Sequence, residues 1–308
     1  MPPRPAAYSG VFPIAPTPFS SAGELDLGGM RRVLDCMLDQ VVDGICILAN
    51  YSEQFLLTDA ERDTLLELCL EHIAGRVPVI VTCSHYSTRI AAARASKAAK
   101  AGAQMLMLMP PYHGATLKAD EKGIAEHFAR VAEASPLPIM VQDAPLSGVA
   151  LSVRFLARLA QEVPQVSYFK IEVPNAAAKL RALIDAGGKA IRGPFDGEES
   201  ITLMADLNAG ATGTMPSALL PDLIKPVLEL HRKGQREGAM AAYARILPLI
   251  NYENRQCGLR ATKTVMMEGR VIKSDAVRHP LEALHPATKK GLLELARAAN
   301  PLALRWGK

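Results

Sequence analysis

Lys170 and Glu172 are the two residues of this sequence whose types and spacing best fit covalent chemistry. They lie in the run 166–173, which is otherwise apolar enough to form a buried strand. Side chains alternate faces along a strand, so the Lys170 amine and the Glu172 carboxylate point the same way. A lysine is rarely buried without a partner, and a desolvated lysine attacks carbonyl carbons to form a Schiff base. The pair therefore predicts a Schiff-base lysine with a carboxylate for proton transfer, and the alternative is a solvated pair on an edge strand.

Eight strand-like runs alternate with helical runs before residue 220 and would position this pair. The strand-like runs are 11–16, 44–49, 77–83, 105–109, 138–142, 167–172, 190–195 and 212–216. Most are continuously apolar, which is typical of parallel strands covered on both faces. This order predicts an α/β fold, a (β/α)8 TIM barrel. A doubly wound sheet is the alternative, but it would usually have fewer strands and a glycine-rich first turn.

The helical runs between the strands carry recognisable signals. Residues 30–38 place apolar side chains on one helical stripe, and Thr58 with Glu61 forms a capping box at the start of the next helix. After residue 220 the strand signals stop and four helical runs follow: 219–232, 236–250, 259–267 and 280–299. We therefore expect residues 1–220 to form the barrel with the active site, and residues 221–308 to form a C-terminal helical extension packed on the barrel.

Polar residues follow several of the predicted strands at their carboxyl ends, where the reactive groups of such barrels gather. The candidate substrate-binding residues are Asn50, Tyr51 and Ser52 after the second strand, Gln142 at the fifth, Gly193, Asp196 and Glu198 at the seventh, and Gly213, Thr214 and Ser217 at the eighth. Turns favour such residues for backbone reasons alone. Their repeated occurrence beside a lysine-bearing strand favours a binding site.

Composition excludes several classes of function. The formal net charge of +4 is spread along the chain without a block of like charges, so we expect no nucleic-acid partner, and a basic binding protein stays an alternative that only the charge supports. An odd count of five cysteines without a Cys-x-x-Cys motif is typical of reduced core cysteines. With no signal-like apolar core and no run of membrane-spanning length, we expect a cytoplasmic protein without a membrane partner. The scattered histidines form no metal-binding motif, and no phosphate-binding loop is present, so we expect no metal and no nucleotide.

The order and spacing of these elements resemble the N-acetylneuraminate lyase and dihydrodipicolinate synthase superfamily over nearly the whole chain. The segments that carry the resemblance are 10–19, Pro110–Tyr112, Pro145–Gly148, Lys170 and Gly210–Gly213. The resemblance implies that Lys170 forms the Schiff base, that no other cofactor is needed, and that the substrate is a small α-keto sugar acid. It also implies a homotetramer made of two tight dimers, with the loop 110–113 near the tight-dimer interface.

The sequence departs from the family at two places that decide the reaction. The family binds the substrate carboxylate with a Gly-Thr/Ser-Thr-Gly-Glu motif, where this chain has Ala49–Glu53. The proton-shuttling tyrosine of the fifth strand is replaced by Gln142, and glutamine is neither an acid nor a base near neutral pH. Ser147 resembles the lyase branch, and the arginine of the synthase branch is absent. Glu172 is then the residue left for proton transfer, which favours dehydration over aldol cleavage.

These features together predict a dehydratase of a 2-keto-3-deoxy sugar acid. Lys170 would form an iminium at C2, Glu172 would remove a proton from C3, and the C4 hydroxyl would leave with a proton from Glu172 or from water. The resemblance implies that the substrate is L-2-keto-3-deoxyarabonate and the product 2,5-dioxopentanoate, in non-phosphorylative pentose breakdown. A six-carbon diacid would call for an arginine at the seventh strand, where Asp196 and Glu198 suit hydroxyls instead. An aldolase of the same family that releases pyruvate, and a non-catalytic sugar-acid-binding regulator, stay open.

Overall fold

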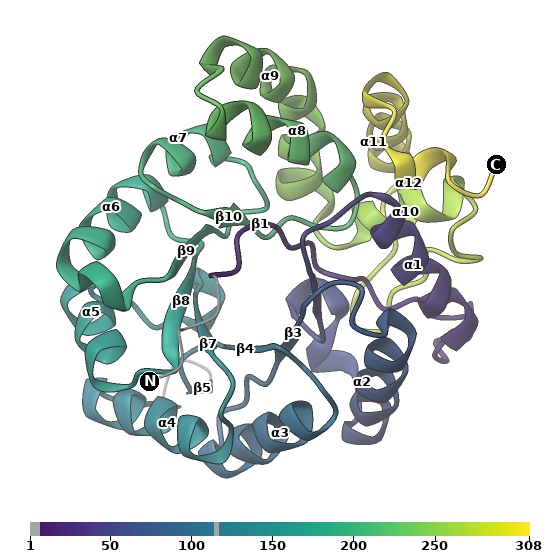
Figure 1. Cartoon of the computed structure of the whole chain (residues 1–308). Helices are drawn as coiled ribbons and strands as arrows, with labels where there is room; N and C mark the ends of the chain where they lie inside the picture. Colours follow the sequence, from purple (N-terminus) through teal and green to yellow (C-terminus); the bar gives the residue numbers. More distant parts are fainter. Residues whose placement is uncertain (1–6, 114–116) are drawn as a thin grey trace.

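The fold is a closed barrel of parallel strands surrounded by helices (Figure 1). The computed structural model describes residues 7–113 and 117–308. Within these residues, eight parallel strands form one sheet in the order β1-β10-β9-β8-β7-β4-β3-β2. Ile14 bridges to Cys46 of β2 on one side and to Ser217 on the other, so the two edges of the sheet are joined. The predicted (β/α)8 TIM barrel is confirmed.

Each barrel strand overlaps one of the eight predicted runs. The strands are β1 (Gly10–Val11), β2 (Ile45–Ile47), β3 (Val79–Thr82), β4 (Met105–Leu108), β7 (Ile139–Asp143), β8 (Val166–Ile171), β9 (Gly193–Asp196) and β10 (Gly213–Thr214). A short antiparallel hairpin of β5 (Tyr112–His113) and β6 (Leu117–Lys118), which the sequence did not predict, follows β4. It does not join the barrel sheet.

Helices on the outside of the barrel connect the strands, as Figure 1 shows. They are α1 (Leu27–Asp39), α2 (Asp59–Ile73), α3 (Thr88–Lys100), α4 (Glu121–Ala134), α5 (Val153–Glu162), α6 (Ala176–Gly187), α7 (Leu203–Asn208) and α8 (Pro221–Arg232). The predicted capping box is present: the Thr58 hydroxyl accepts from the Glu61 N–H, and the Glu61 carboxylate accepts from the Thr58 N–H.

Further helices follow in the C-terminal part of the chain. They are α9 (Arg236–Tyr252), the π-helical turn η5 (Glu253–Cys257), α10 (Arg260–Glu268), α11 (Pro286–Ala299) and α12 (Leu302–Arg305). The sequence placed the start of α11 at residue 280, but the helix begins at Pro286. Proline suits a first helical position, and the His285 side chain accepts from the Ala287 N–H there. The division of the chain at residue 220 stays a prediction.

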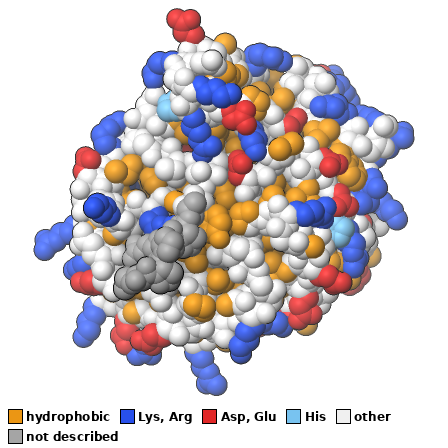
Figure 2. Space-filling model, viewed as in Figure 1, with side chains coloured by type: hydrophobic (Ala, Val, Ile, Leu, Met, Phe, Trp, Pro, Cys, Tyr) orange, Lys and Arg blue, Asp and Glu red, His pale blue; other side chains and the backbone are white. Residues whose placement is uncertain are grey.

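Among the described residues, no helix combines the length and the apolar character needed to cross a membrane. On the face seen in Figure 2, lysine, arginine, aspartate and glutamate side chains are interspersed around the rim, and apolar side chains lie toward the middle. No basic stripe of the kind that follows a nucleic-acid backbone is visible on this face.

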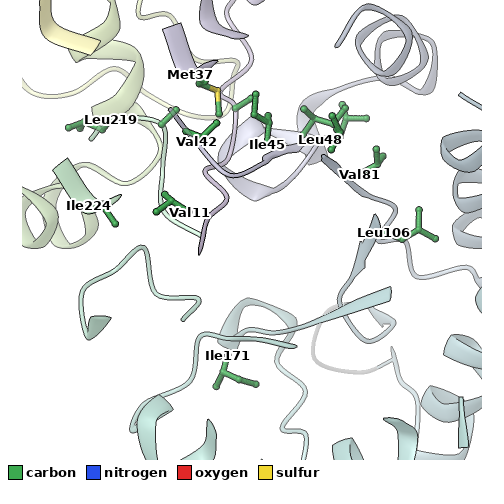
Figure 3. Close-up of a cluster of buried hydrophobic side chains, with 14 of the residues drawn as sticks. Val11, Met37, Val42, Ile45, Leu48, Val81, Leu106, Ile171, Leu219 and Ile224 are labelled. Carbon is green, nitrogen blue, oxygen red and sulfur yellow. The ribbon is translucent and has the colours of Figure 1, made fainter. Parts of the chain in front are cut away.

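The core has two parts, because strand side chains alternate between the barrel interior and the helices. Side chains that point outward pack against the helices, as Figure 3 shows for Val11, Ile45, Val81, Leu106 and Ile171. The side chains that fill the interior form a separate cluster of Phe12, Ile14, Cys46, Ala49, Ile80, Met105, Met107, Met140, Tyr168, Phe195 and Met215. Lys170 alternates with Phe169 and Ile171 and therefore shares the inner face of β8 with Tyr168.

A buried ion pair ties the C-terminal helices to the barrel. Lys263 of α10 lies 2.5 Å from the Glu53 carboxylate in the segment after β2, and both side chains are fully buried. The Arg278 N–H also donates to this carboxylate at 3.0 Å. Two charges removed from water in this way are stable only together, since either one alone would be buried without compensation.

We predict that Lys263→Met destabilises the protein by about 3–5 kcal/mol, the usual effect of leaving one member of a buried pair uncompensated. The double variant Glu53→Gln/Lys263→Met should recover much of this loss, because it removes both charges. Urea unfolding of the variants measures both effects. The exposed Lys290–Glu294 pair on α11 provides the control: Lys290→Met should cost no more than about 1 kcal/mol. A double variant that is less stable than Lys263→Met would contradict the interpretation.

Candidate active site

Lys170 is buried at the carboxyl end of β8 between two carboxylates. Its side chain is 1% exposed, and its Nζ lies 2.5 Å from Glu172 Oε1 and 3.9 Å from Glu199 Oε1. Burial by itself lowers the pKa of this lysine, but the two carboxylates outweigh burial and the net shift is upward. The sequence suggested that desolvation would strip the proton. The two carboxylates instead favour the ammonium form, so an attack of Lys170 on a carbonyl would first require transfer of a proton to a neighbour.

Gln142 fixes the position of Glu172. It is the register partner of Lys170 on the adjacent strand β7, and its Nε2 donates to Glu172 Oε1 at 2.8 Å. The Glu172 backbone N–H donates to the Asp143 carbonyl at 3.0 Å, which holds the end of the strand. One carboxylate oxygen of Glu172 therefore faces both the lysine and the glutamine. Gln142 orients the carboxylate, and this is a task that an uncharged amide performs well.

Glu199 was not identified from the sequence, although it is the second carboxylate beside the lysine. It lies in the turn after β9, where Glu199 and Ser200 have φ angles of 46° and 71°. Burial raises the pKa of Glu199 well above its usual value, Lys170 opposes this shift and Glu172 adds to it. The environment thus favours a neutral acid. Two consecutive left-handed residues other than glycine are uncommon and frequently mark functional turns, but the residue types give no signal of them.

Gly197 allows this turn to lie against the lysine, and it too was missed. A Cβ at this position would fall 2.7 Å from Glu172 Cγ and 2.8 Å from Lys170 Cγ. The predicted Gly193 lies one layer lower in the barrel, opposite Tyr168. A Cβ there would lie 2.1 Å from the Tyr168 ring, so this glycine makes room for the aromatic floor beneath Lys170.

The predicted carboxylate-binding residues form the 3-10 turn η1 (Asn50–Ser52) after β2. The Ser52 hydroxyl donates to the Ala15 carbonyl at 2.6 Å and accepts from the Ala49 N–H, so it holds the turn. Asn50 Oδ1 accepts from Gln54 Nε2 at 2.6 Å. Burial, followed by the charges of Glu199, Glu253 and Glu172, raises the pKa of Tyr51 and keeps its hydroxyl neutral. Of the three residues, Tyr51 has the clearest electrostatic contact with the lysine's neighbours.

Asp196 and Thr214 lie on the opposite face of the barrel wall from Lys170. The register pairs Lys170 with Phe195 and Ile171 with Asp196, so Asp196 points outward like Ile171. Thr214 is the register partner of Asp196 and donates its hydroxyl to Asp196 Oδ2. The structure does not bring these two side chains to the lysine. The predicted Gly213 faces inward, where an added Cβ would meet the Phe195 ring.

The π-helical turn η5 completes the rim of the site from a distant part of the sequence. Arg255 lies 2.8 Å from the predicted Glu198, so an arginine does stand beside the turn after β9, contrary to the sequence-based expectation. Ser217 hydrogen-bonds Glu253, and burial raises the pKa of Glu253 to about 7. π-Helical turns frequently occur at functional sites. Neither Arg255 nor Glu253 was found from the sequence, because helices after the barrel carry no strand-end signal.

The comparisons with known proteins agree with this geometry. The model of the dihydrodipicolinate synthetase family matches residues 7–299. The L-2-keto-3-deoxyarabonate dehydratase of Azospirillum brasilense is 58% identical over 299 residues, which cover 97% of both chains. The 4-hydroxy-tetrahydrodipicolinate synthase of Rhizobium meliloti is 29% identical and covers 95% of this chain and 99% of its own.

Among solved structures, a putative dihydrodipicolinate synthetase from Pseudomonas aeruginosa has a TM-score of 0.88 at 28% identity, covering 94% of this chain and 99% of that chain. The resemblance seen in the sequence is confirmed by the family model, by these relatives and by the fold. This chain belongs to the dihydrodipicolinate synthetase family.

Proposed function

We propose that this protein is a hydro-lyase that removes water from L-2-keto-3-deoxyarabonate and releases 2,5-dioxopentanoate, in the non-phosphorylative breakdown of L-arabinose. The observation that carries the proposal is the relative of this activity in Azospirillum brasilense, which is 58% identical over nearly the full length. The reaction is the one that the exchange of tyrosine for Gln142 predicted from the sequence. The arrangement around Lys170 supplies a chemical route for it.

The first half of the route builds the imine. Glu172 Oε1, at 2.5 Å, takes a proton from the Lys170 ammonium, and the neutral amine attacks C2 of the substrate. Glu172 returns this proton to the C2 oxygen, which leaves as water, so that Lys170 carries an iminium and Glu172 is again a carboxylate. The iminium acidifies the C3 protons because it accepts the electron pair that deprotonation leaves behind.

The second half divides proton transfer between the two carboxylates. Glu172 removes a C3 proton, and the enamine that forms expels the C4 hydroxyl. Glu199, whose pKa is raised by burial, donates the proton with which this hydroxyl leaves as water. Tautomerisation carries the unsaturation to C5, and hydrolysis of the iminium releases the product and Lys170. The split follows a general pattern in which paired groups take acid and base roles according to their environments.

Aldol cleavage with release of pyruvate is the second candidate, and the same geometry disfavours it. Cleavage between C3 and C4 requires a base that removes the proton of the C4 hydroxyl. The amide of Gln142 cannot act as that base and is already engaged with Glu172. Glu199 favours its neutral form and so suits donation to the hydroxyl.

We assign substrate recognition to three parts of the rim. The turn Asn50–Ser52 and the Tyr51 hydroxyl bind the carboxylate, as the corresponding place does in the superfamily. The Glu198–Arg255 pair and Ser217 with Glu253 face the hydroxyls at the far end. The remaining predicted residues shape the wall around the lysine rather than contacting substrate: Gly193, Asp196, Gly213 and Thr214.

No cofactor beyond the Lys170 imine is needed for this route, because the iminium itself accepts the electron pair. We also propose a cytoplasmic location, which the five free and buried cysteines support.

We further propose that the protein is a homotetramer built from two tight dimers. Three large apolar side chains are exposed on one part of the surface: Phe55 at 58%, Tyr86 at 41% and Leu146 at 56%. They line a hollow of about 790 Å³, and Tyr112 of the predicted interface loop lies in it. Exposed apolar patches of this kind mark contacts with other chains.

Light scattering at micromolar concentration should therefore find a tetramer. Phe55→Glu should lower the assembly state, because a carboxylate in an apolar contact loses its water without gaining a partner. Met240→Glu on α9, another exposed apolar side chain at 45%, provides the control and should leave the assembly unchanged. A monomeric wild-type protein would refute the tetramer.

Incubation with L-2-keto-3-deoxyarabonate should yield 2,5-dioxopentanoate, measured by coupling to a semialdehyde dehydrogenase. Lys170→Arg should give no product, because a guanidinium cannot form the imine. Pyruvate and glycolaldehyde as the main products would overturn the dehydratase and favour the aldolase, and lack of any turnover would leave a sugar-acid-binding protein.

Glu172→Gln and Glu199→Gln should each slow dehydration by about 10²–10⁴-fold, the usual contribution of an acid or base group. They should differ in the exchange of the pyruvate methyl protons with D₂O, followed by proton NMR. Exchange needs the imine and the C3 base alone, so Glu199→Gln should retain it and Glu172→Gln should lose it. The exposed Glu162→Gln on α5 is the control for both rates. Equal loss of exchange in the two variants would contradict the division of roles.

A further inference from the structure

Glu199 depends on a turn whose conformation is unfavourable by itself. Two successive residues in the left-handed region, Glu199 and Ser200, persist only where the surroundings impose this conformation. Four residues outside the turn contact it. The Tyr243 hydroxyl of α9 contacts the carbonyls of Ser200 and Ile201, at 3.1 and 2.6 Å. The remaining contacts lead to two aspartates.

Asp196 and Asp206 hydrogen-bond this turn at Ser200 and at Thr202. Asp196 Oδ2 accepts from the Ser200 N–H at 3.1 Å and from the Thr214 hydroxyl, which itself contacts the Ser200 hydroxyl at 2.8 Å. Asp206 Oδ2, on α7, accepts from the Thr202 hydroxyl at 2.6 Å. Both aspartates are fully buried. Helix α7 packs against β9, and a hydrogen bond between these two side chains is one cause of the pKa shift of each.

The second oxygen of each carboxyl group, Oδ1, indicates how the two aspartates are joined. Asp196 Oδ1 and Asp206 Oδ1 are buried, and within the described residues no N–H or O–H group donates to either. Two ionised carboxylates in contact inside a protein would repel strongly. A single proton between the two Oδ1 atoms removes this repulsion and satisfies both atoms at once.

We propose that Asp196 and Asp206 share one proton, and that this acid–carboxylate pair is a positioning device that holds the turn 197–202 so that Glu199 faces Lys170. The inference deepens the proposed function, because it concerns the residue that donates a proton to the leaving hydroxyl. Asp196 and Asp206 touch no substrate; they act through the turn.

The charges around the pair agree with a shared proton. Burial and then the charge of Asp206 raise the pKa of Asp196 to about 8, while Lys170 opposes the shift. Burial raises the pKa of Asp206, and the nearby Glu198 adds to it. Above about pH 8 the pair loses its proton. Two carboxylates then repel each other, and the turn that carries Glu199 is released.

Asp206→Asn tests the device, because an amide supplies by itself the donor that the shared proton provides. Its NH₂ group donates to Asp196 Oδ1 and its oxygen accepts from Thr202, so no proton is needed at any pH. We expect wild-type kcat for dehydration to fall about tenfold per pH unit above pH 8, as for loss of one essential proton. Asp206→Asn should retain most of its activity at pH 7 and lack this fall. Asp206→Ala should lose about tenfold or more at pH 7, since small displacements of catalytic groups have effects of this size.

Asp222→Asn is the matched control. Burial raises the pKa of Asp222 as well, but its carboxylate accepts from the Leu302 N–H, far along the chain from the turn. This variant should keep the wild-type pH profile. All variants should form the borohydride-trapped adduct with pyruvate, which shows that Lys170 and the barrel are intact. If Asp206→Ala does not form the adduct, the pH profiles of Asp206→Asn and the wild-type protein alone test the shared proton.

An infrared titration distinguishes failure of this device from failure of the proposed function. Between pH 7 and 9.5 the wild-type difference spectrum should show loss of one protonated carboxyl band that Asp206→Asn lacks. An alkaline fall in Asp206→Asn equal to that of wild type, or the same carboxyl band in both proteins, would overturn the shared proton. Absence of dehydration by the wild-type protein would overturn the function, and the infrared result would still decide the pair.

Discussion

The buried ammonium of Lys170 between two carboxylates is the interaction on which the rest of the site depends. A charged lysine inside a barrel costs several kcal/mol unless close partners compensate it. Glu172 compensates it at 2.5 Å from two residues further along the chain, and Glu199 lies 3.9 Å away in the turn after the next strand. The carboxylate that makes burial tolerable is also the group to which we assign proton transfer at C3. Stability of the lysine and its chemistry therefore rest on the same contacts.

Residues around Lys170, Glu172 and Glu199 hold these three side chains in place. Gln142 holds Glu172 from one neighbouring strand, and Gly197 lets the turn of Glu199 approach from the other. Beneath the lysine, Tyr168 and Phe195 fill the barrel and keep water away from its stem. The C-terminal helices supply Arg255 at the rim and the Lys263–Glu53 pair below the turn after β2. The helices that follow the barrel strands thus take part in the site.

The sequence predicted the parts of this arrangement that follow from periodicity. Apolar runs located all eight strands, and strand alternation placed Glu172 on the face of Lys170. Side-chain parity also explains why two predicted residues, Asp196 and Thr214, do not reach the lysine. Asp196 is one residue out of phase with Phe195, so it points away from the interior, which could be seen only once the register with β8 was known. Glu199 and Gly197 were missed because their positions depend on a turn with left-handed residues, and Arg255 because it comes from a helix far along the chain.

The central claim is that Lys170 carries the imine, and one measurement tests it most directly. Reduction with borohydride in the presence of pyruvate, followed by peptide mapping, locates the covalent adduct. Lys263 is the natural competitor, because it is also fully buried and burial lowers its pKa, but Glu53 and the Phe19 ring enclose it. We expect one adduct, on the peptide that contains Lys170, and none in Lys170→Arg. An adduct on Lys263 or on another lysine would contradict it.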